Sequence, residues 1–360
     1  MSYNSDRLKR IDSCIVIGGG ITGLITATIL QRKGIEVTVL DKGRGIGGRL
    51  ATKRIDRDEP TEAVFDYGTQ YFSVEHPKLK PWIDDWLKQG IIKEWFGNDT
   101  DKIRYCGVNG TRGIAKYLAK DLNVHTSSKV IKVSYDEQWL VETEGDRFLN
   151  GALRQRPEGT LHPKGAVSLM GETPKTALNR FYKGDTLIMT PPVPQSLALL
   201  DASEIALPPD IKSSLERVRY YSCIAVLALL EKHSNIPAPG GIALEDESLI
   251  WLADTYQKGI SNSYAVTLHA TPKFSETHWD SDDAEIADKL FTAASEYLNS
   301  AVTKYQVHRW RYSLPKTFYN EPCLVLPELS LVMAGDAFVA PKIAGAMLSG
   351  IAASESIVAS

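Results

Sequence analysis

Three glycines near the N-terminus have a spacing that can hold a diphosphate. Gly18, Gly20 and Gly23 follow the apolar run CIVI and open a segment with apolar residues at helical spacing. In a G-x-G-x-x-G turn the glycines permit a tight bend, close approach of a pyrophosphate, and close packing of helix on strand. The helix start adds free N–H groups and a partial positive charge, and Thr22 stands in this first turn.

An acid follows at the distance that such a phosphate site requires. Asp41 ends the strand-like run IEVTVL, about 20 residues after the glycines, where a carboxylate can accept a hydrogen bond from a ribose hydroxyl. Lys42 comes directly after it. Because strand, glycines, helix, strand and acid arrive in this order, residues 13–42 predict a dinucleotide-binding unit, with a plain glycine turn as the alternative. This unit does not distinguish NAD from FAD.

The next loop, DKGRGIGGRL, brings a second glycine turn and a guanidinium group. Gly47 and Gly48 let the backbone approach a ligand, and Arg49 can offer a fork of donors to phosphate oxygens. The alternative is a basic surface loop. The segment FDYGTQYF at 65–72 is expected to form a compact turn that can serve as one wall for a planar ring.

These motifs resemble a known family. GGGITGL, DKGRGIGGR and FDYGTQYF look like the FAD-binding signatures of the monoamine-oxidase-type flavoproteins, and their combination is most similar to the renalase-like branch, especially its bacterial members. The likeness recurs over nearly the whole chain, in LIMTPPVPQSLALL, VTLHATPKFSETHWD, HRWRYSLP, MAGDAF and GAMLSGIAAS. It implies an α/β fold with a Rossmann-like FAD-binding domain of the monoamine oxidase/p-hydroxybenzoate hydroxylase type and a second, mixed-sheet substrate domain.

The resemblance also implies where a non-covalently held FAD binds. The backbone near Val130 would lie beside the adenine, Asp336 would meet the ribityl or phosphate part, and the helix that follows would point its N-terminus at the flavin. A helix N-cap is the alternative role for Asp336. The expected cofactor-binding residues are Gly18, Gly20, Thr22, Gly23, Asp41, Lys42, Gly48, Arg49, Val130, Gly335, Asp336, Gly345 and Ala346.

The expected substrate side comes from stretches that carry the renalase-like resemblance outside the cofactor motifs. Its candidate catalytic residues are Gln70, Tyr71, His269, Arg309 and Trp310. An aromatic ring can stack on a flat substrate, Gln70 can orient a carboxamide, and Arg309 or His269 can hold the distal part. Each also has a structural alternative: a core tryptophan, a buried histidine, or a solvated charge on a sheet.

The resemblance implies a donor class as well. It points to dihydronicotinamides reduced at the wrong ring carbon, isomers of NAD(P)H, which would be oxidised to NAD(P)⁺ with O₂ as acceptor and H₂O₂ as product. A dihydropyridine gives up hydride readily, so the chemistry needs no strong general base. The alternatives are an amine oxidase with aromatics such as Tyr312, Tyr319 and Trp310 around the amine, a desaturase, and a flavin-binding redox sensor without turnover.

Composition narrows the other possibilities. The chain has 360 residues, 43% of them hydrophobic, and a net charge of −3, which gives no general attraction to nucleic acid or anionic membrane. Its four cysteines form no C-x-x-C pair, its histidines lack metal-ligand spacing, and we expect reduced thiols in a cytoplasm and no bound metal. The basic and apolar N-terminal stretch imitates a secretory signal, but it contains the glycine site, so we reject that interpretation. The run CIAVLALL is too short to span a bilayer.

The sequence also suggests domain boundaries. We expect residues 13–80, 105–195 and 323–358 to form the FAD-binding domain, and residues 81–104 and 196–322 the substrate domain. Residues 76–95 carry a helical pattern. Residues 150–185 have no clear period, and form either a lid or partner loop or a tolerated surface insertion.

Overall fold

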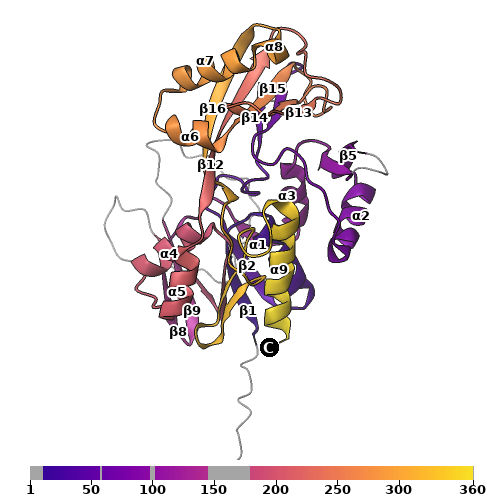
Figure 1. Cartoon of the computed structure of the whole chain (residues 1–360). Helices are drawn as coiled ribbons and strands as arrows, with labels where there is room; N and C mark the ends of the chain where they lie inside the picture. Colours follow the sequence, from indigo (N-terminus) through magenta and orange to yellow (C-terminus); the bar gives the residue numbers. More distant parts are fainter. Residues whose placement is uncertain (1–10, 57–58, 98–101, 145–178, 360) are drawn as a thin grey trace, which may run out of the picture.

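The computed structural model describes residues 11–56, 59–97, 102–144 and 179–359, and Figure 1 shows two sheets at opposite ends of the molecule. Most of the 150–185 segment, with its expected lid or insertion, lies outside the described residues, as do residues 1–10. Within the described ranges, no helix combines the length and the apolar character needed to cross a membrane.

The first sheet is the Rossmann-like core. Its strand order is β17-β18-β11-β1-β2-β7, parallel except for the edge strand β17. Apolar runs such as CIVI and TLIM form its central strands because a parallel sheet is covered on both faces. The strands are β1 (Ser13–Ile17), β2 (Glu36–Leu40), β7 (Asn123–His125), β11 (Thr186–Met189), β17 (Leu324–Leu326) and β18 (Leu331–Met333).

One face of this sheet is covered by two closely packed helices, α1 (Ile21–Arg32) and α9 (Lys342–Val358). A Cβ on Gly350 would lie 2.7 Å from the carbonyl oxygen of Thr22, so a glycine is needed where the helices cross. The hydroxyl of Thr26 donates to the Gly350 carbonyl at 2.9 Å. The two helices therefore approach each other closely at Gly350.

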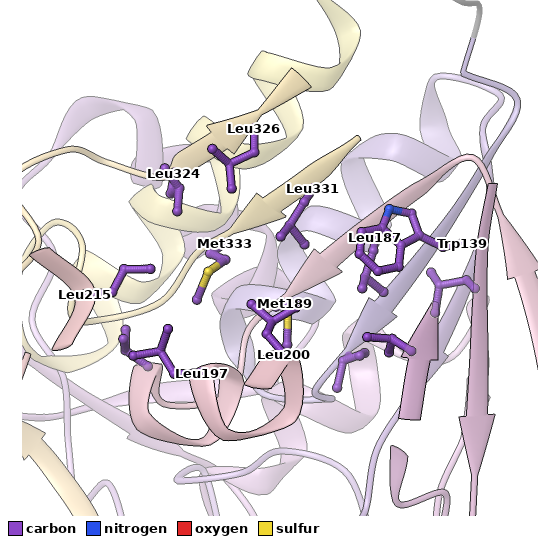
Figure 2. Close-up of a cluster of buried hydrophobic side chains, with 14 of the residues drawn as sticks. Trp139, Leu187, Met189, Leu197, Leu200, Leu215, Leu324, Leu326, Leu331 and Met333 are labelled. Carbon is purple, nitrogen blue, oxygen red and sulfur yellow. The ribbon is translucent and has the colours of Figure 1, made fainter. Parts of the chain in front are cut away.

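The other face carries the core drawn in Figure 2, which joins the sheet to two further layers. Trp139 comes from an antiparallel three-stranded sheet, and Leu197, Leu200 and Leu215 come from two helices. These helices belong to the first domain, so the expected boundary at residue 196 is wrong. The elements are β8 (Val130–Asp136), β9 (Gln138–Thr143), β10 (Arg180–Gly184), α4 (Val193–Ala202) and α5 (Pro209–Glu216).

The second domain is built on a five-stranded sheet of order β13-β14-β15-β12-β16, and all its described pairings are antiparallel. Strand β12 runs toward it from the first domain (Figure 1). Three helices cover one face of the sheet. The elements are β12 (Tyr220–Leu230), β13 (Gly241–Ala243), β14 (Leu249–Asp254), β15 (Ala265–Ala270), β16 (Val302–Pro315), α6 (Pro272–Thr277), α7 (Asp283–Ala293) and α8 (Ser295–Leu298).

Residues 76–95, expected to form one helix, instead form a shorter helix followed by a strand. A 3₁₀ turn (Pro77–Leu79) leads into α2 (Lys80–Lys88), Gly90 has a φ of +66°, and β5 (Ile92–Phe96) follows. Gly90 allows a left-handed turn that most residues avoid, which ends the helix. Strand β5 pairs with β6 (Arg104–Gly107).

Helix α2 also corrects the domain assignment of residues 81–104. Ile83 and Trp86 are buried among side chains of α1, α9 and α3 (Arg112–Leu118), in the first domain. Among the described residues of 81–104, strand β5 reaches the second sheet, where the indole of Trp95 lies 6.2 Å from that of Trp251. The segment therefore bridges the domains.

A small hairpin, β3 (Thr52–Ile55) with β4 (Ala63–Asp66), is anchored to the second sheet by a buried ion pair. The Nζ atom of Lys258 lies 2.8 Å from Oδ2 of Asp66, and both side chains are fully buried. The other oxygen, Oδ1, accepts hydrogen bonds from Thr52 Oγ1 at 2.7 Å and from the backbone N–H of Thr111 at 2.8 Å. One carboxylate thus joins the hairpin, the start of α3 and the loop after β14.

We predict that Asp66→Ala lowers the free energy of unfolding by about 3–5 kcal/mol, because it leaves the Lys258 charge buried without its partner. Urea titration at pH 7 measures the change. Asp84→Ala is the control, since Asp84 pairs with Lys80 on the surface and such a pair contributes about 0–1 kcal/mol. An Asp66→Ala protein within about 1 kcal/mol of wild type would contradict the anchoring role.

Candidate functional site

The first glycine turn is built by packing constraints at two of its three glycines. Gly18 has a φ of +105°, and a Cβ there would lie 2.5 Å from Thr190 Oγ1. A Cβ on Gly23 would lie 2.1 Å from the carbonyl oxygen of Gly18. These two positions exclude every larger side chain, so the turn holds α1 tightly against the ends of β1 and β11.

The remaining glycine faces open space. A Cβ on Gly20 would meet no atom within 4 Å, and Gly20 is the N-cap of α1 without a side chain to cap the helix. The first turn of a helix leaves N–H groups without intrahelical partners. Uncapped donors beside open space fit a diphosphate, which the helix dipole also favours.

Asp41 already has hydrogen-bond partners from the two glycine loops. Its Oδ2 accepts the N–H of Gly19 and its Oδ1 accepts the N–H of Gly43, both at 2.6 Å. A carboxylate oxygen has a second lone pair, so a ribose hydroxyl can still bind. Next to it, Lys42 donates to Gln195 Oε1 at 3.0 Å.

The expected adenine position lies at the same end of the sheet. The backbone N–H of Ser128 donates to the Asp41 carbonyl at 2.8 Å, two residues before Val130 begins β8. Val130 is partly buried against the core of Figure 2. The structure therefore places Val130 on the segment that borders Asp41, and its contact with adenine stays a prediction.

Arg49 and Asp336 bind each other. The guanidinium Nη1 lies 2.5 Å from Oδ2 of Asp336, Nη2 lies 2.8 Å from Oδ1, and Nη1 also donates to the Ser313 carbonyl at 3.1 Å. The alternative of Asp336 as a helix N-cap is wrong, because α9 begins after Pro341 and has no side-chain cap. Arg49 was expected to bind phosphate oxygens, but in this structure its guanidinium binds the Asp336 carboxylate. The pair therefore links the second glycine loop to the C-terminal segment.

The other expected residues of the C-terminal segment position α9. Gly335 donates its N–H to Ser349 Oγ at 2.9 Å, and a Cβ on Gly345 would lie 1.9 Å from the Ala340 carbonyl oxygen. The hydroxyl of Thr22 donates to the Ala346 carbonyl at 3.0 Å. The Thr22 side chain, in the first turn of α1, therefore joins α1 to α9.

On the substrate side, three expected residues gather around one residue that the sequence analysis did not single out, Tyr67. Its carbonyl accepts the indole N–H of Trp310 at 2.8 Å, and the ring nitrogen Nε2 of His269 lies 3.2 Å from the same oxygen. The rings of Tyr67 and Trp310 stack at 5.4 Å with an angle of 26°, and His308 meets Tyr67 edge-on at 4.7 Å.

Gln70 brings an unsatisfied acceptor to this group. Its amide nitrogen donates to the Asp66 carbonyl and lies 3.4 Å from Nε2 of His269, whereas its Oε1 is buried and has no hydrogen-bond partner among the described residues. Buried polar atoms are nearly always satisfied, so an orphaned acceptor indicates a missing donor.

His269 is neutral at physiological pH. Burial, helped by the nearby charge of Lys258, lowers the pKa of its imidazole to about 4. Because Nε2 faces the Tyr67 carbonyl, the single ring proton sits on Nε2, and Nδ1 remains an acceptor. The site therefore presents neutral polar atoms and aromatic rings.

Two of the expected substrate residues lie elsewhere. Tyr71 packs against Trp251 at 5.1 Å and Phe96 at 5.5 Å, in an aromatic group next to β5. Each of the three guanidinium nitrogens of Arg309 has a partner, at 2.7–2.9 Å: Asp283 or the carbonyl of Trp279 or Ser281. Neighbouring strand residues face opposite sides, so Arg309 and Trp310 diverge. Trp251 packs in the same aromatic group as Tyr71.

Of the site residues that were not predicted, some leave a signal in the sequence and others do not. His308 and Trp310 are two apart on a strand, so their shared face follows from period 2. Nothing in the sequence distinguishes Lys258 from other lysines, because its burial depends on Asp66, 192 positions away.

Comparisons with known sequences match the N-terminal part of the chain. A family model described as an NAD(P)-binding Rossmann-like domain matches residues 16–86. The chain is 32% identical over 65 residues to a carotenoid phi-ring synthase of Streptomyces griseus, and 40% identical over 74 residues to an uncharacterized protein of Acanthamoeba polyphaga mimivirus. These matches span 18% and 20% of this chain but only 13% and 15% of the relatives' own lengths.

Solved structures share the fold over nearly the whole chain. A fatty acid isomerase from P. acnes that produces CLA aligns with a TM-score of 0.63 at 9% identity, covering 99% of both chains. Wild-type putrescine oxidase bound to putrescine aligns with a TM-score of 0.66 at 12% identity, covering 97% of this chain and 99% of that one. At such identities the likeness concerns the fold, which is α/β with a Rossmann-like NAD(P)-binding domain.

The glycine turn yields a paired prediction. Gly23→Ala is expected to lower the free energy of unfolding by about 1–3 kcal/mol, because the methyl group overlaps the Gly18 carbonyl. Gly20→Ala is expected to cost less than about 1 kcal/mol, yet to weaken FAD binding, because its methyl group fills the open space beside α1. Urea unfolding without cofactor and fluorescence titration with FAD measure the two effects. Normal FAD affinity in Gly20→Ala would show that the diphosphate binds elsewhere.

Proposed function

We propose that this chain is an FAD-dependent oxidoreductase whose cofactor is held non-covalently. The Rossmann-domain match, the fold shared with putrescine oxidase and the uncapped start of α1 support the proposal. When bound, FAD supplies a hydride acceptor at its ring and passes electrons on to O₂.

Different residues of the chain would bind different parts of the cofactor. The first turn of α1 would bind the diphosphate, Asp41 the adenine ribose, and the backbone near Val130 the adenine. Arg49, Asp336 and the start of α9 would border the flavin half, since they join the second glycine loop to the C-terminal segment. Gly48 has a φ of +53°, and a Cβ on it would lie 3.6 Å from the Gly20 Cα, so the second glycine loop lies beside the first.

We further propose that the electron donor is a dihydronicotinamide, specifically an isomer of NAD(P)H reduced at the wrong ring carbon. The observation that carries this is the buried Oε1 of Gln70, which has no partner among the described residues and lies beside neutral His269 and the stacked Tyr67–Trp310 pair. The acceptor Oε1 would receive a carboxamide N–H, and an aromatic ring would hold the flat substrate. The distance from ring carbon to acceptor decides which isomer reacts, because hydride transfer requires close approach.

The residues around this site would orient the donor rather than move protons. Loss of hydride leaves an aromatic nicotinamide cation, so no base must remove a proton. Neutral His269 suits this reaction, because a protonated imidazole would repel the cation that forms. Oxidation of a primary amine is the second candidate, favoured by the fold shared with a putrescine-binding oxidase.

The cofactor assignment predicts a yellow protein that releases FAD. Heat or acid precipitation should leave the colour in the supernatant, and chromatography against standards should identify FAD and not FMN. The reason is that a ribose site at Asp41 serves the adenosine half, which FMN lacks. Colour retained in the washed pellet, FMN alone, or a folded protein that ignores added FAD would contradict the assignment.

The donor assignment predicts that isomeric dihydronicotinamides bleach the flavin much faster than ordinary NADH or a primary amine in anaerobic single-turnover mixing. Gln70→Ala and His269→Ala should slow the reaction and retain FAD, and His233→Ala, at an exposed histidine, is the control. Because the His269 pKa lies near 4, the bleaching rate of wild type should stay level between about pH 5.5 and 8 and fall only at more acidic pH, as the imidazole gains its proton.

Two results would contradict the donor assignment while leaving the flavoprotein proposal in place. One is a primary amine that reduces the flavin faster than any dihydronicotinamide. The other is equal bleaching by NADH and its isomers, which would mean that the site does not select the reacting carbon.

A further inference from the structure

A basic pocket opens beside the β3–β4 hairpin and helix α3. It has a volume of about 610 Å³, and five of its ten lining residues are cationic: Lys53, Arg54, Arg112, Lys116 and Lys120. None of the described residues that line it is a carboxylate. The whole chain has a net charge of −3, so this concentration of positive charge is a local feature of the pocket and does not follow from the overall composition.

Within the described residues, part of this charge has no counterion. Arg54 pairs with Glu62, but Lys53 and Lys120 form no ion pair with any described residue. Arg112 uses only its Nε, which donates to the Ile46 carbonyl at 3.1 Å, and its two Nη groups make no hydrogen bond within the described part of the chain. Convergent, unneutralised cations make a site for an anion with several oxygens, such as a phosphate.

The pocket adjoins the proposed ring site. Thr52 pairs with Asp66 across the hairpin, and its hydroxyl accepts the N–H of Arg112 at 3.1 Å while donating to Asp66. Tyr67, whose carbonyl receives Trp310 and His269, is the next residue along the chain.

Two cations of the pocket also shift the pKa values of residues at the ring site. Burial lowers the pKa of His308, and the charge of Lys53 lowers it further. Burial raises the pKa of the Tyr67 phenol, and the charge of Arg112 opposes that rise. Two cations of the pocket therefore lie close enough to the aromatic group to act on it.

We propose that this pocket binds the phosphate groups of a dinucleotide substrate while its nicotinamide ring lies at the Tyr67–Trp310 pair. The inference rests on the proposed function and adds a second anchor to it. The ring site holds a flat, nearly neutral group, and the pocket holds the charged remainder of the same molecule. A donor without phosphates would then use the ring site alone.

The test compares Lys53→Ala/Lys120→Ala with wild type, using two forms of each isomeric donor: the dihydronicotinamide dinucleotide and its N-methyl analogue without phosphates. In the double variant the half-saturating concentration of the dinucleotide should rise about tenfold or more with an unchanged limiting rate of bleaching. The half-saturating concentration of the N-methyl analogue should not change. Lys132→Ala, at an exposed strand lysine outside the pocket, is the matched control.

An equal change for both donors, or no change for the dinucleotide, overturns the inference. A second arm needs no flavin reduction: calorimetric titration with ADP-ribose should show binding to wild type and at least tenfold weaker binding to the double variant. That result supports the pocket even if no dihydronicotinamide bleaches the flavin, an outcome that would overturn the proposed function alone. Inorganic phosphate binding as tightly as ADP-ribose would identify a free-phosphate site and overturn the substrate assignment.

Discussion

The buried carboxylate of Asp66 is the constraint on which the site depends. Lys258, Thr52 and Thr111 all donate to it, and the Asp66 carbonyl receives Gln70 and the hydroxyl of Thr267. Burying two charges costs several kcal/mol per ion, and such a pair persists only when its remaining lone pairs and protons are satisfied. Lys258 meets that condition, because its ammonium group also donates to the Gln70 carbonyl and lies over the Trp95 ring. The network thereby fixes where Tyr67 and Gln70 can stand relative to the second sheet.

The cofactor side depends on a different constraint, close approach of backbone to backbone. Gly23 against Gly18 and Gly350 against Thr22 bring β1, α1 and α9 nearer than side chains would allow. Arg49 and Asp336 then join the second glycine loop to the C-terminal segment by two charge-assisted hydrogen bonds. Tight packing at Gly18 and Gly23 leaves open space beside Gly20, and the candidate diphosphate site lies in that space.

The sequence correctly predicted the elements that a local pattern determines. It did not predict side-chain partners that are distant in the chain. The glycine spacing and apolar runs predicted β1, α1 and β2, because packing against a parallel sheet requires them. The helical pattern of 76–95 gave a wrong prediction for the end of this segment. Gly90 ends the helix, and the apolar residues after it form a strand. Arg49 was expected to face a phosphate, yet its partner lies 287 positions away, as Lys258 lies 192 positions from Asp66. Ionic pairing over such separations leaves no periodicity to detect.

In the proposed binding mode, the ring site and the basic pocket would favour different parts of one dinucleotide molecule. A unit charge 4 Å from another interacts by roughly 4 kcal/mol at the effective dielectric of a protein surface region. A protonated His269 would therefore oppose a reaction that creates a cation on the ring, and burial prevents this by keeping the imidazole neutral. The Lys258 charge, though close, is neutralised by Asp66. Cations that form no ion pair with any described residue lie instead in the basic pocket, at Lys53, Lys120 and Arg112, where a phosphate would gain from them. The same physical rule, that unpaired charge stays out of the buried site, thus accounts for both the neutral ring site and the positive pocket beside it.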